Sequence, residues 1–419
     1  MIKHIFKQIW VERRLNSWIL LELTAVLFFL LIMCDFMWIK LKNYIEPKGF
    51  DTENTYILPL KMLSPAAPNY VDPAQNTMSP IEELTKLTDQ IRQYPDIESL
   101  SLSLHSKPYS MGGYWLGAVT DTITTSSMRI RQVTPSYFDV FRITSPDGKP
   151  IGIETTGRRQ AIITKSLALQ LFGSVDNAYG KNIRIGDQEA DDNANIAAVS
   201  ANHKVHDFYP YQNTYYEVIQ PYELEKMAMV NNIKMIEICV RVRPGTTQHF
   251  SENFEADMGE RLKVNNLYVS TIISSEKLRD DVVGKMIRQE ILIMTYVMVF
   301  VLITAFFGIF GSFWLRTRQR KCEIGVRMAM GANKSMIRYS MIAEGLCLLI
   351  IALIPSFIIY INLLNAEVLN AGNLPFTFDR VMIVLTSSLL IIITIIISGI
   401  YQPASHAAST PPVDALRDE

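Results

Sequence analysis

Four long apolar runs constrain the fold of this 419-residue chain more than any other feature. A helix needs about 20 mainly apolar residues to cross the hydrocarbon core of a bilayer. A buried core helix could account for one such run, but four of them, three in the last third of the chain, indicate a membrane protein. The predicted transmembrane helices are residues 18–39, 289–315, 339–364 and 381–401.

The first run differs from a cleaved signal peptide in two respects. It is longer than the apolar region of a signal peptide, which has about 7–15 residues. Lys40, Leu41 and Lys42 follow it, where a cleavage site would need small residues. We therefore interpret this run as a retained membrane helix.

Lysine and arginine residues set the expected orientation, because they accumulate on the cytoplasmic side of a membrane. Residues 316–338 contain seven of them, whereas residues 365–380 contain only Arg380. The segment before the first helix is also basic. We predict that the amphipathic segment 1–17, the loop 316–338 and the tail 402–419 are cytoplasmic, so both termini are inside. Residues 40–288 and 365–380 are then extracytoplasmic.

The large segment 40–288 is long enough to fold as a domain with its own core. A helix and a strand are predicted near its start, and a strand, a helix and a further strand near its end, which suggests one α/β subdomain built from both ends. On the strand after residue 235, alternation puts Cys239, Glu237 and Arg241 on the face opposite the apolar residues. The predicted elements are Pro80–Tyr94, Ile97–Leu104, Ile236–Val242, Phe250–Leu262 and Asn266–Ile273.

Between these ends, at about 129–225, the sequence predicts a β-rich insertion. A short helix, Ser166–Phe172, is expected to end at Gly173, and Asp187–Asn195 is expected to be a polar loop. The predicted strands are Arg129–Phe141, Gln160–Thr164 and Asn182–Ile185. The fold class is therefore an α-helical membrane protein with four transmembrane helices and a mixed α/β extracytoplasmic domain.

Motifs for catalysis, nucleotide binding and metal binding are absent from the sequence. Residues 331–335 lack the glycine that precedes lysine in a P-loop, and the formal net charge of -1 does not favour nucleic-acid binding. The four cysteines have no metal-ligand spacing. We interpret residues 203–207 (HKVHD) and the acidic residues of 187–192 as solvated loops, and we predict no catalytic residue and no metal site.

Three acidic residues, Glu22, Asp35 and Glu344, lie within the apolar runs. A charge at mid-bilayer costs about 2.5–3.5 kcal/mol on insertion scales. All three lie near the ends of their runs, so we favour shallow positions at the interface and leave polar contact between helices open. We expect these acids to be structural, because none lies where a proton relay through the bilayer centre would need it.

Two cytoplasmic motifs resemble those of a known family. Residues 323–332 read EIGVRMAMGA, which is similar to the EIG[IV]R-x-A-x-GA signature of MacB/FtsX-type ABC permeases. Residues 403–417 are similar to the closing motif of that family. The outer segment contains VTPSYF at 133–138, AIIT at 161–164 and LFG at 171–173, which resemble the MacB-type periplasmic core domain. The closing-motif residues are Pro403, Ala404, Ala407, Ala408, Pro412, Ala415, Leu416 and Arg417.

The resemblance implies that the first motif is a coupling helix that docks on an ATPase. As a helix, it would place Ile324, Met328 and Ala332 on one face, with Arg320, Glu323 and Arg327 around it. The alternative is a helix that lies on anionic lipid. Ser405 and His406 depart from the basic pair of the family, which bears on contacts with the membrane surface or the ATPase. The docking candidates are Glu323, Ile324, Gly325, Val326, Arg327, Ala329, Gly331 and Ala332.

The resemblance further implies a permease of the bacterial inner membrane that binds no cofactor itself, with ATP bound and hydrolysed by a partner ABC ATPase. The other expected partners are a second permease copy or a paralogue, membrane lipid, and a periplasmic or outer-membrane protein. Our leading hypothesis is export or extraction of a substrate by mechanotransmission. An FtsX-like regulator of a cell-wall hydrolase is the alternative, and a sensor-receptor is a third class, which would need a longer cytoplasmic segment than the sequence offers.

Overall fold

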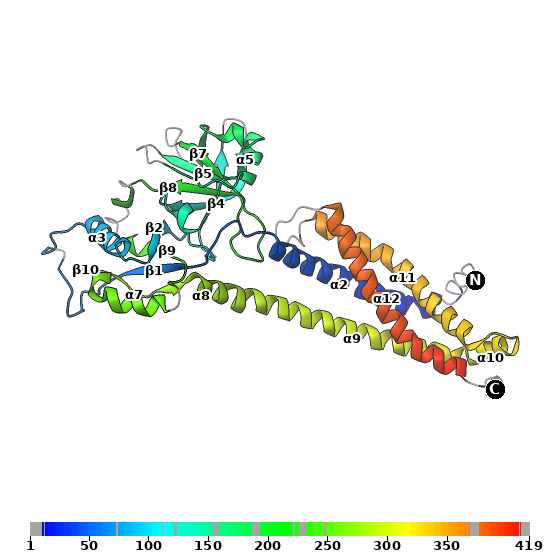
Figure 1. Cartoon of the computed structure of the whole chain (residues 1–419). Coiled ribbons are helices and arrows are strands. Elements are labelled where there is room, and N and C mark those ends of the chain that lie inside the picture. The colour runs from blue at the N-terminus through cyan, green and yellow to red at the C-terminus, as the bar shows by residue number, and fades with distance from the viewer. Residues whose placement is uncertain are drawn as a thin grey trace. The chain divides into compact units, whose positions relative to one another are not determined.

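The computed structural model describes residues 11, 13–72, 74–110, 112–120, 124–153, 159–186, 193–220, 223–225, 232–246, 249–366, 368, 377–409 and 411. These residues form two compact units. The membrane unit draws on Met1–Lys42 and Arg288–Glu419, and the α/β unit on Asn43–Ile287 (Figure 1). The sequence placed these boundaries at 40 and 288.

The membrane unit contains four helices that are long and apolar enough to cross a bilayer. Each extends beyond its predicted apolar run, because helical hydrogen bonding continues into flanking polar residues that need not lie in the hydrocarbon core. The helix that includes α9 begins earlier still, with α8 (Ser275–Arg279) and a π-helix over Asp280–Ile287. The four helices are α2 (Arg13–Ile45), α9 (Arg288–Gln319), α11 (Lys334–Asn365) and α12 (Phe378–Ser409).

A small residue allows close packing where α11 meets α12 and α9. A Cβ atom at Gly345 of α11 would overlap Ile400 of α12, and it would lie 3.1 Å from Cγ2 of Ile396 and 3.5 Å from Cζ of Phe313. Lipid tails are as apolar as the helices, so close contact contributes much of the association between helices in a membrane. Gly345 is therefore a packing residue of the helix bundle.

We expect Gly345→Leu to lower the free energy of unfolding by about 1–3 kcal/mol, because the added side chain forces the helices apart. Gly311→Leu on α9 is the matched control, since a Cβ at Gly311 meets no atom within 4 Å. The measurement is the unfolding midpoint of each purified full chain in detergent. Equal shifts for the two variants would show that close packing at Gly345 does not matter.

The α/β unit contains a 12-stranded sheet, and one part of it is built from the two ends of the segment, as predicted. In that part β2 (Ile97–Leu104) pairs antiparallel with β9 (Ile236–Val242), with Leu100 opposite Val240. Apolar residues of the helices α3 and α7 complete the core below these strands. The other elements of this subdomain are α3 (Pro80–Arg92), α7 (Phe250–Met258), β1 (Thr55–Met62), β10 (Lys263–Val264), β11 (Leu267–Val269) and β12 (Ile273–Ser274).

The second part of the sheet is the predicted β-rich insertion, and it has its own apolar core. Strand β5 lies between β7, to which it is parallel, and β8, to which it is antiparallel. The helix α5 (Lys165–Phe172) ends at Gly173, which has a φ of 74°. The strands of this subdomain are β3 (Tyr114–Val119), β4 (Thr124–Val133), β5 (Gln160–Thr164), β6 (Asn182–Ile185), β7 (Ala194–Ser200) and β8 (Thr214–Val218).

Several predicted segments are wrong in part. The strand expected over Arg129–Phe141 ends at Val133, because Pro135 cannot donate to the ladder and the chain then forms the helix α4 (Tyr137–Val140). The strand expected over Asn266–Ile273 is divided into β11 and β12. The helix expected over Phe250–Leu262 ends at Met258 and continues as a 3₁₀ turn. The loop expected at Asp187–Asn195 is shorter than predicted at its end, because β7 begins at Ala194. Residues 187–192 of that loop lie outside the described residues.

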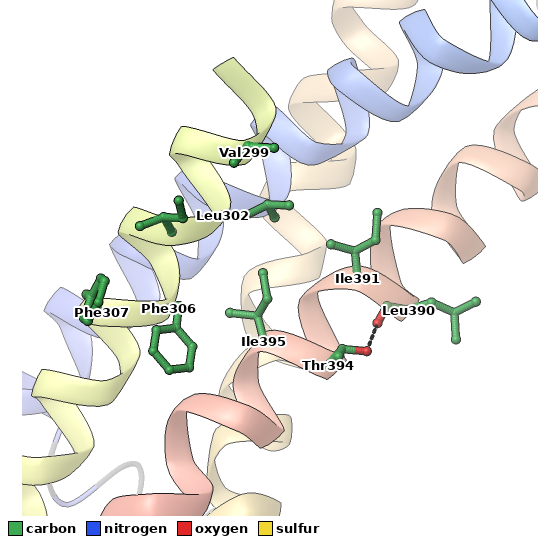
Figure 2. Close-up of a pocket in the computed structure, with 9 residues that line it drawn as sticks. Val299, Leu302, Phe306, Phe307, Leu390, Ile391, Thr394 and Ile395 are labelled. Carbon is green, nitrogen blue, oxygen red and sulfur yellow. Dashed lines mark hydrogen bonds between the residues drawn. The ribbon is translucent and has the colours of Figure 1, made fainter. Parts of the chain in front are cut away.

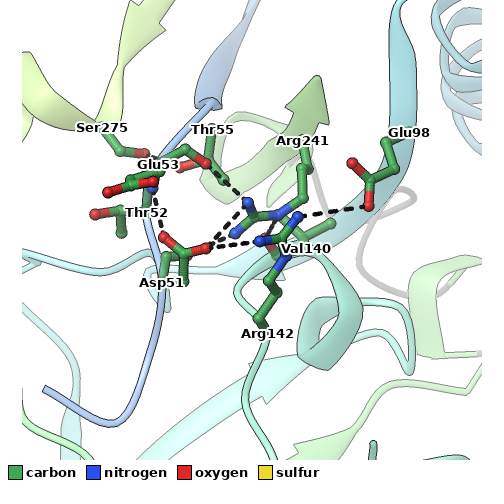
Figure 3. Close-up of polar contacts among 9 residues, drawn as sticks. All are labelled: Asp51, Thr52, Glu53, Thr55, Glu98, Val140, Arg142, Arg241 and Ser275. Carbon is green, nitrogen blue, oxygen red and sulfur yellow. Dashed lines mark hydrogen bonds and ion pairs between the residues drawn. The ribbon is translucent and has the colours of Figure 1, made fainter. Parts of the chain in front are cut away.

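The polar face of β9 is also buried, which the alternation pattern did not predict. Cys239 contributes to an apolar cluster that lies between the two subdomains, and Glu237 forms an ion pair with Lys107. The Arg241 side chain is only 1% exposed. Its Nε donates to the Val140 carbonyl at 2.6 Å, and its Nη1 and Nη2 donate to the carbonyls of Glu53 and Asp51 at 2.8 Å (Figure 3).

Residues 203–207, predicted to be a solvated loop, are buried instead. Burial, with the positive charge of Arg131, lowers the pKa of His203 to about 3, so the ring is neutral at physiological pH. Its Nε2 lies 2.8 Å from the Tyr216 hydroxyl. Among the residues that the structure describes, no three histidine, cysteine or acidic side chains lie together as metal ligands would.

Candidate functional site

Most residues of the first cytoplasmic motif form a short helix, α10 (Lys321–Ala329), between α9 and α11. Ala332, which the sequence analysis placed on this helix, follows it instead. The turn at Arg320, with φ -102° and ψ 17°, separates it from α9. Gly331 adopts a φ of 101°, which is strained for other residues, and so ends the helix. Asn333 then caps α11 by accepting a hydrogen bond from the Met336 N–H at 2.8 Å. A glycine therefore follows the C-terminal end of α10, and a turn at Arg320 precedes its start.

The predicted docking residues divide between the exposed surface of α10 and its contact with the bundle. Ile324 and Gly325 are buried, and Met328 and Ala332 pack partly against the core of the membrane unit. These residues attach the helix to the bundle, so the buried Ile324 and Gly325 are not part of an accessible docking surface. The exposed face instead carries Glu323, Val326, Ala329 and Met330, together with Gly331 after the helix.

This exposed surface combines apolar side chains with charge. Val326 is 44% exposed and Met330 76% exposed. Glu323 and Arg327 form an ion pair across one turn of the helix. An exposed apolar centre beside polar residues is typical of a protein interface, where the apolar residues supply most of the binding energy.

The C-terminal motif lies partly on α12, where its alanines pack against α10. Ala404 and Ala408 are buried, are one helical turn apart, and belong to the same apolar cluster as Ile324. The His406 ring lies against Trp314 of α9 in a tilted arrangement, with ring centroids 5.1 Å apart. Pro403 is buried within α12, and Ala407 is half-buried. Pro412, Ala415, Leu416 and Arg417 lie outside the described residues.

A polar cluster connects α9, α11 and α2 next to α10. Glu344 of α11 accepts hydrogen bonds from Arg316 and, at 2.9 Å, from Arg320. Arg316 also donates to the side-chain oxygen of Asn16 on α2. Both Glu344 and Arg316 are buried. The sequence analysis used Arg316 as an orientation signal and placed Arg320 beside the coupling helix, without a partner for either. Arg320 immediately precedes α10, so Glu344 helps to position that helix.

A second buried ion pair joins α2 and α12. Arg380 donates to both carboxylate oxygens of Asp35, at 2.7 and 2.6 Å. Its side chain is 5% exposed and that of Asp35 is 4% exposed. Glu22, the third acid in the apolar runs, lies against Gly308 of α9, where a Cβ atom would overlap its carboxylate. For Asp35 and Glu344 the structure thus shows polar contact between helices, which the sequence analysis had ranked below a shallow position.

An apolar groove of about 540 Å³ lies between α9 and α12 (Figure 2). The side chains in Figure 2 come from two neighbouring helices, and Thr394 is the polar residue among them. Its hydroxyl donates to the Leu390 carbonyl at 2.8 Å, so this group is satisfied within its own helix. The groove therefore offers no polar recognition and no catalytic group.

Two family models match separate parts of the chain. The model described as MacB-like periplasmic core domain matches residues 46–256, which is half of the chain, and the model described as FtsX-like permease C-terminal matches residues 295–412. The first match lies within the α/β unit. The second contains α10, α11, α12 and most of α9.

Curated relatives match over a longer continuous region. An export ATP-binding/permease protein of Pseudomonas fluorescens (strain Pf0-1) is 26% identical over 300 residues, which are 69% of this chain and 43% of the relative. The syringafactin export ATP-binding/permease protein SyfD of Pseudomonas syringae pv. tomato is 25% identical over 296 residues, or 69% and 42% of the two chains. This chain thus spans less than half the length of these relatives.

Solved structures were found with a limited similarity to this chain. The periplasmic region of MacB from Actinobacillus actinomycetemcomitans matches at 12% identity with a TM-score of 0.33, covering 58% of this chain and 99% of that one. A domain of a permease protein from Porphyromonas gingivalis matches at 15% identity with a TM-score of 0.34, covering 54% and 92%.

Proposed function

Because the chain belongs to the ABC-type export permease family with a MacB-like periplasmic core domain and an FtsX-like C-terminal region, we propose that it transmits ATP-driven motion across the bacterial inner membrane. A partner ATPase subunit hydrolyses ATP, and the α/β unit acts on a substrate outside the cytoplasm. Both chain termini lie in the cytoplasm. The substrate is exported or extracted without passing a polar path through the helices, and the chain itself is not an enzyme.

The observation that carries this proposal is the exposed face of α10. One face of the helix is fixed to the bundle by Ile324, and the opposite face presents Val326 and Met330. Glu344 ties the residue before α10 to α11. A partner that pushes on this helix therefore acts on α9 and α11 together, which is what transmission of a movement requires.

The permease works in the complex with a second copy of itself or a paralogue. In the membrane unit, large apolar side chains of α9 are exposed, among them Tyr296, Phe300 and Phe307. Within a bilayer such a surface suits lipid or a second set of transmembrane helices. The alanines of the C-terminal motif pack beside α10. This further supports a complex whose subunits meet on the cytoplasmic side.

We expect the double variant Val326→Asp/Met330→Asp to weaken binding of the partner ATPase at least 30-fold, which corresponds to about 2 kcal/mol at an interface centre. Both side chains are exposed, so the fold should tolerate the change. The measurement is the dissociation constant of the purified permease and ATPase in detergent, where no bilayer can contribute.

Leu169→Asp is the matched control, because Leu169 is a similarly exposed apolar residue (46%) on α5 of the α/β unit. It should leave ATPase binding unchanged. If the α10 variant bound the ATPase normally but no longer bound anionic vesicles, the lipid-surface alternative would replace docking. If the natural permease–ATPase complex stimulated a cell-wall hydrolase and moved no substrate, the FtsX-like role would be favoured.

A further inference from the structure

The connection between β7 and β8 contacts both places where the α/β unit continues into membrane helices. The chain enters the unit through the last residues of α2 and leaves it through α8 and the π-helix. The segment that we call the β7–β8 clamp, residues 202–211, is buried over most of its length. The residues that it contacts where the chain enters and leaves this unit all belong to the α/β unit.

Lys204 of the clamp holds the end of α2. Its side chain is fully buried, and its Nζ donates to the Asn43 carbonyl and, at 3.0 Å, to the Glu46 carbonyl. A cation at the C-terminal end of a helix satisfies carbonyl groups that have no partner in the helix. Burial lowers the pKa of the Lys204 amine, and the Glu46 carboxylate, 3.6 Å away, opposes this effect.

Further contacts surround this lysine. The Phe208 ring stacks on Tyr44 at 5.0 Å between centroids, and the Phe208 carbonyl accepts a bond from the Asn43 side chain at 3.3 Å. The Tyr211 hydroxyl donates to the Pro47 carbonyl at 2.9 Å. Gly49 has a φ of 80°, and a Cβ there would lie 2.8 Å from the Cα of His203. The clamp thus grips the chain from residue 43 to residue 49.

Asp207 of the same segment binds α8, through which the chain leaves the α/β unit. The Arg279 side chain of α8 donates from Nε to one Asp207 oxygen at 3.1 Å and from Nη2 to the other at 3.0 Å. The Asp207 side chain is 7% exposed. This planar two-bond arrangement fixes the orientation of Arg279 as well as its distance. Two residues separate Asp207 from Lys204, so one short loop binds both helix connections.

We propose that Lys204 and Asp207 are positioning residues that couple the ends of α2 and the α8–α9 helix to the α/β unit during transmission. The direct route runs through the strands β1 and β12, which are paired with each other. The clamp adds a second attachment, from the β-rich subdomain, so a movement of either helix reaches the whole sheet. This inference rests on the proposed function and names the residues that perform its outer step.

The test compares nucleotide states of the full permease–ATPase complex in nanodiscs. Hydrogen exchange of peptides from residues 43–50 and from β7 and β8 is measured with ADP and with ATP plus vanadate. We expect a nucleotide-dependent difference in the natural sequence and a difference at least five-fold smaller in Lys204→Met/Asp207→Asn. ATP hydrolysis should stay within two-fold, because these residues are remote in the chain from α10.

Glu237→Gln is the matched control, since it breaks the comparable Lys107 ion pair of the same unit without touching a helix connection. It should keep the difference. The charge exchange Asp207→Arg/Arg279→Asp should restore part of the nucleotide-dependent difference. If Lys204→Met/Asp207→Asn folds poorly, the single variant Asp207→Asn replaces it in the test. A difference that persists in both clamp variants, or that Glu237→Gln also removes, overturns the coupling role while transmission stands. A natural complex that shows no difference overturns transmission, and the coupling role with it.

Discussion

Replacing Arg380 by methionine should lower the free energy of unfolding of the full chain by about 3–5 kcal/mol, because it leaves a buried carboxylate without its counter-charge. Asp35 and Arg380 are both about 95% buried and share two hydrogen bonds. Lipid cannot replace those bonds as water could, so the unpaired Asp35 would be costly. The measurement is the free energy of unfolding in mixed detergent micelles.

The double variant Asp35→Leu/Arg380→Met separates this cost from a general loss of packing. With both charges removed, no charge is left unpaired, and we expect the double variant to be more stable than either single variant. Lys40→Met is the control, because it breaks the Lys40–Glu290 pair, whose glutamate is 41% exposed, and should cost less than about 1 kcal/mol. Additive effects of Asp35→Leu and Arg380→Met would show that the pair is not coupled.

The sequence predicted those parts of the fold that local patterns determine. The strands Ile97–Leu104 and Ile236–Val242 have the predicted bounds, because alternating residues, or a short apolar run, mark a strand locally. The helix expected at 166–172 and its end at Gly173 followed from helical spacing and a glycine stop. Elements that depend on tertiary contacts were less predictable. The break between β11 and β12 is an example, since both pair with β1 at different positions.

The partners of the buried polar residues could not be predicted in the same way. Asp35 and Arg380 are 345 positions apart, and nothing in the local sequence of either indicates the other. A usable signal did exist, since Arg380 was the single basic residue in 365–380 and Asp35 lay near the same end of the bundle. No sequence signal indicated that residues 203–207 are buried, because a run of lysine, histidine and aspartate usually forms a solvated loop.

Ile324 and Gly325 were included among the docking candidates but are buried, for a physical reason that applies to any short connecting helix. Spacing identifies which residues share a face but not whether that face meets the protein or a partner. Ile324 is the more apolar residue, and it is buried against α12 and the other helices, whereas Met330 is exposed. The proposed ATPase contact therefore uses residues that the bundle leaves free.

Glu344→Gln should destabilise the full chain by about 3–5 kcal/mol and also weaken coupling to the ATPase. The substitution keeps the shape of the side chain but removes the negative charge that Arg316 and Arg320 share. Arg316 is 2% exposed, so its charge would remain buried without the carboxylate. Thermal unfolding of the purified full chain and ATP hydrolysis of the reconstituted complex measure the two effects.

Two further variants separate the stabilising role of Glu344 from its effect on α10. Arg320 is 16% exposed and directly precedes α10, so Arg320→Gln should cost only about 1 kcal/mol in stability and still reduce stimulation of the ATPase. Arg316→Met should reproduce most of the loss in stability. If Arg320→Gln leaves ATPase stimulation at its natural level, the Glu344–Arg320 contact does not position α10. The polar cluster would then hold α9 and α11 together without contributing to the transmission of movement.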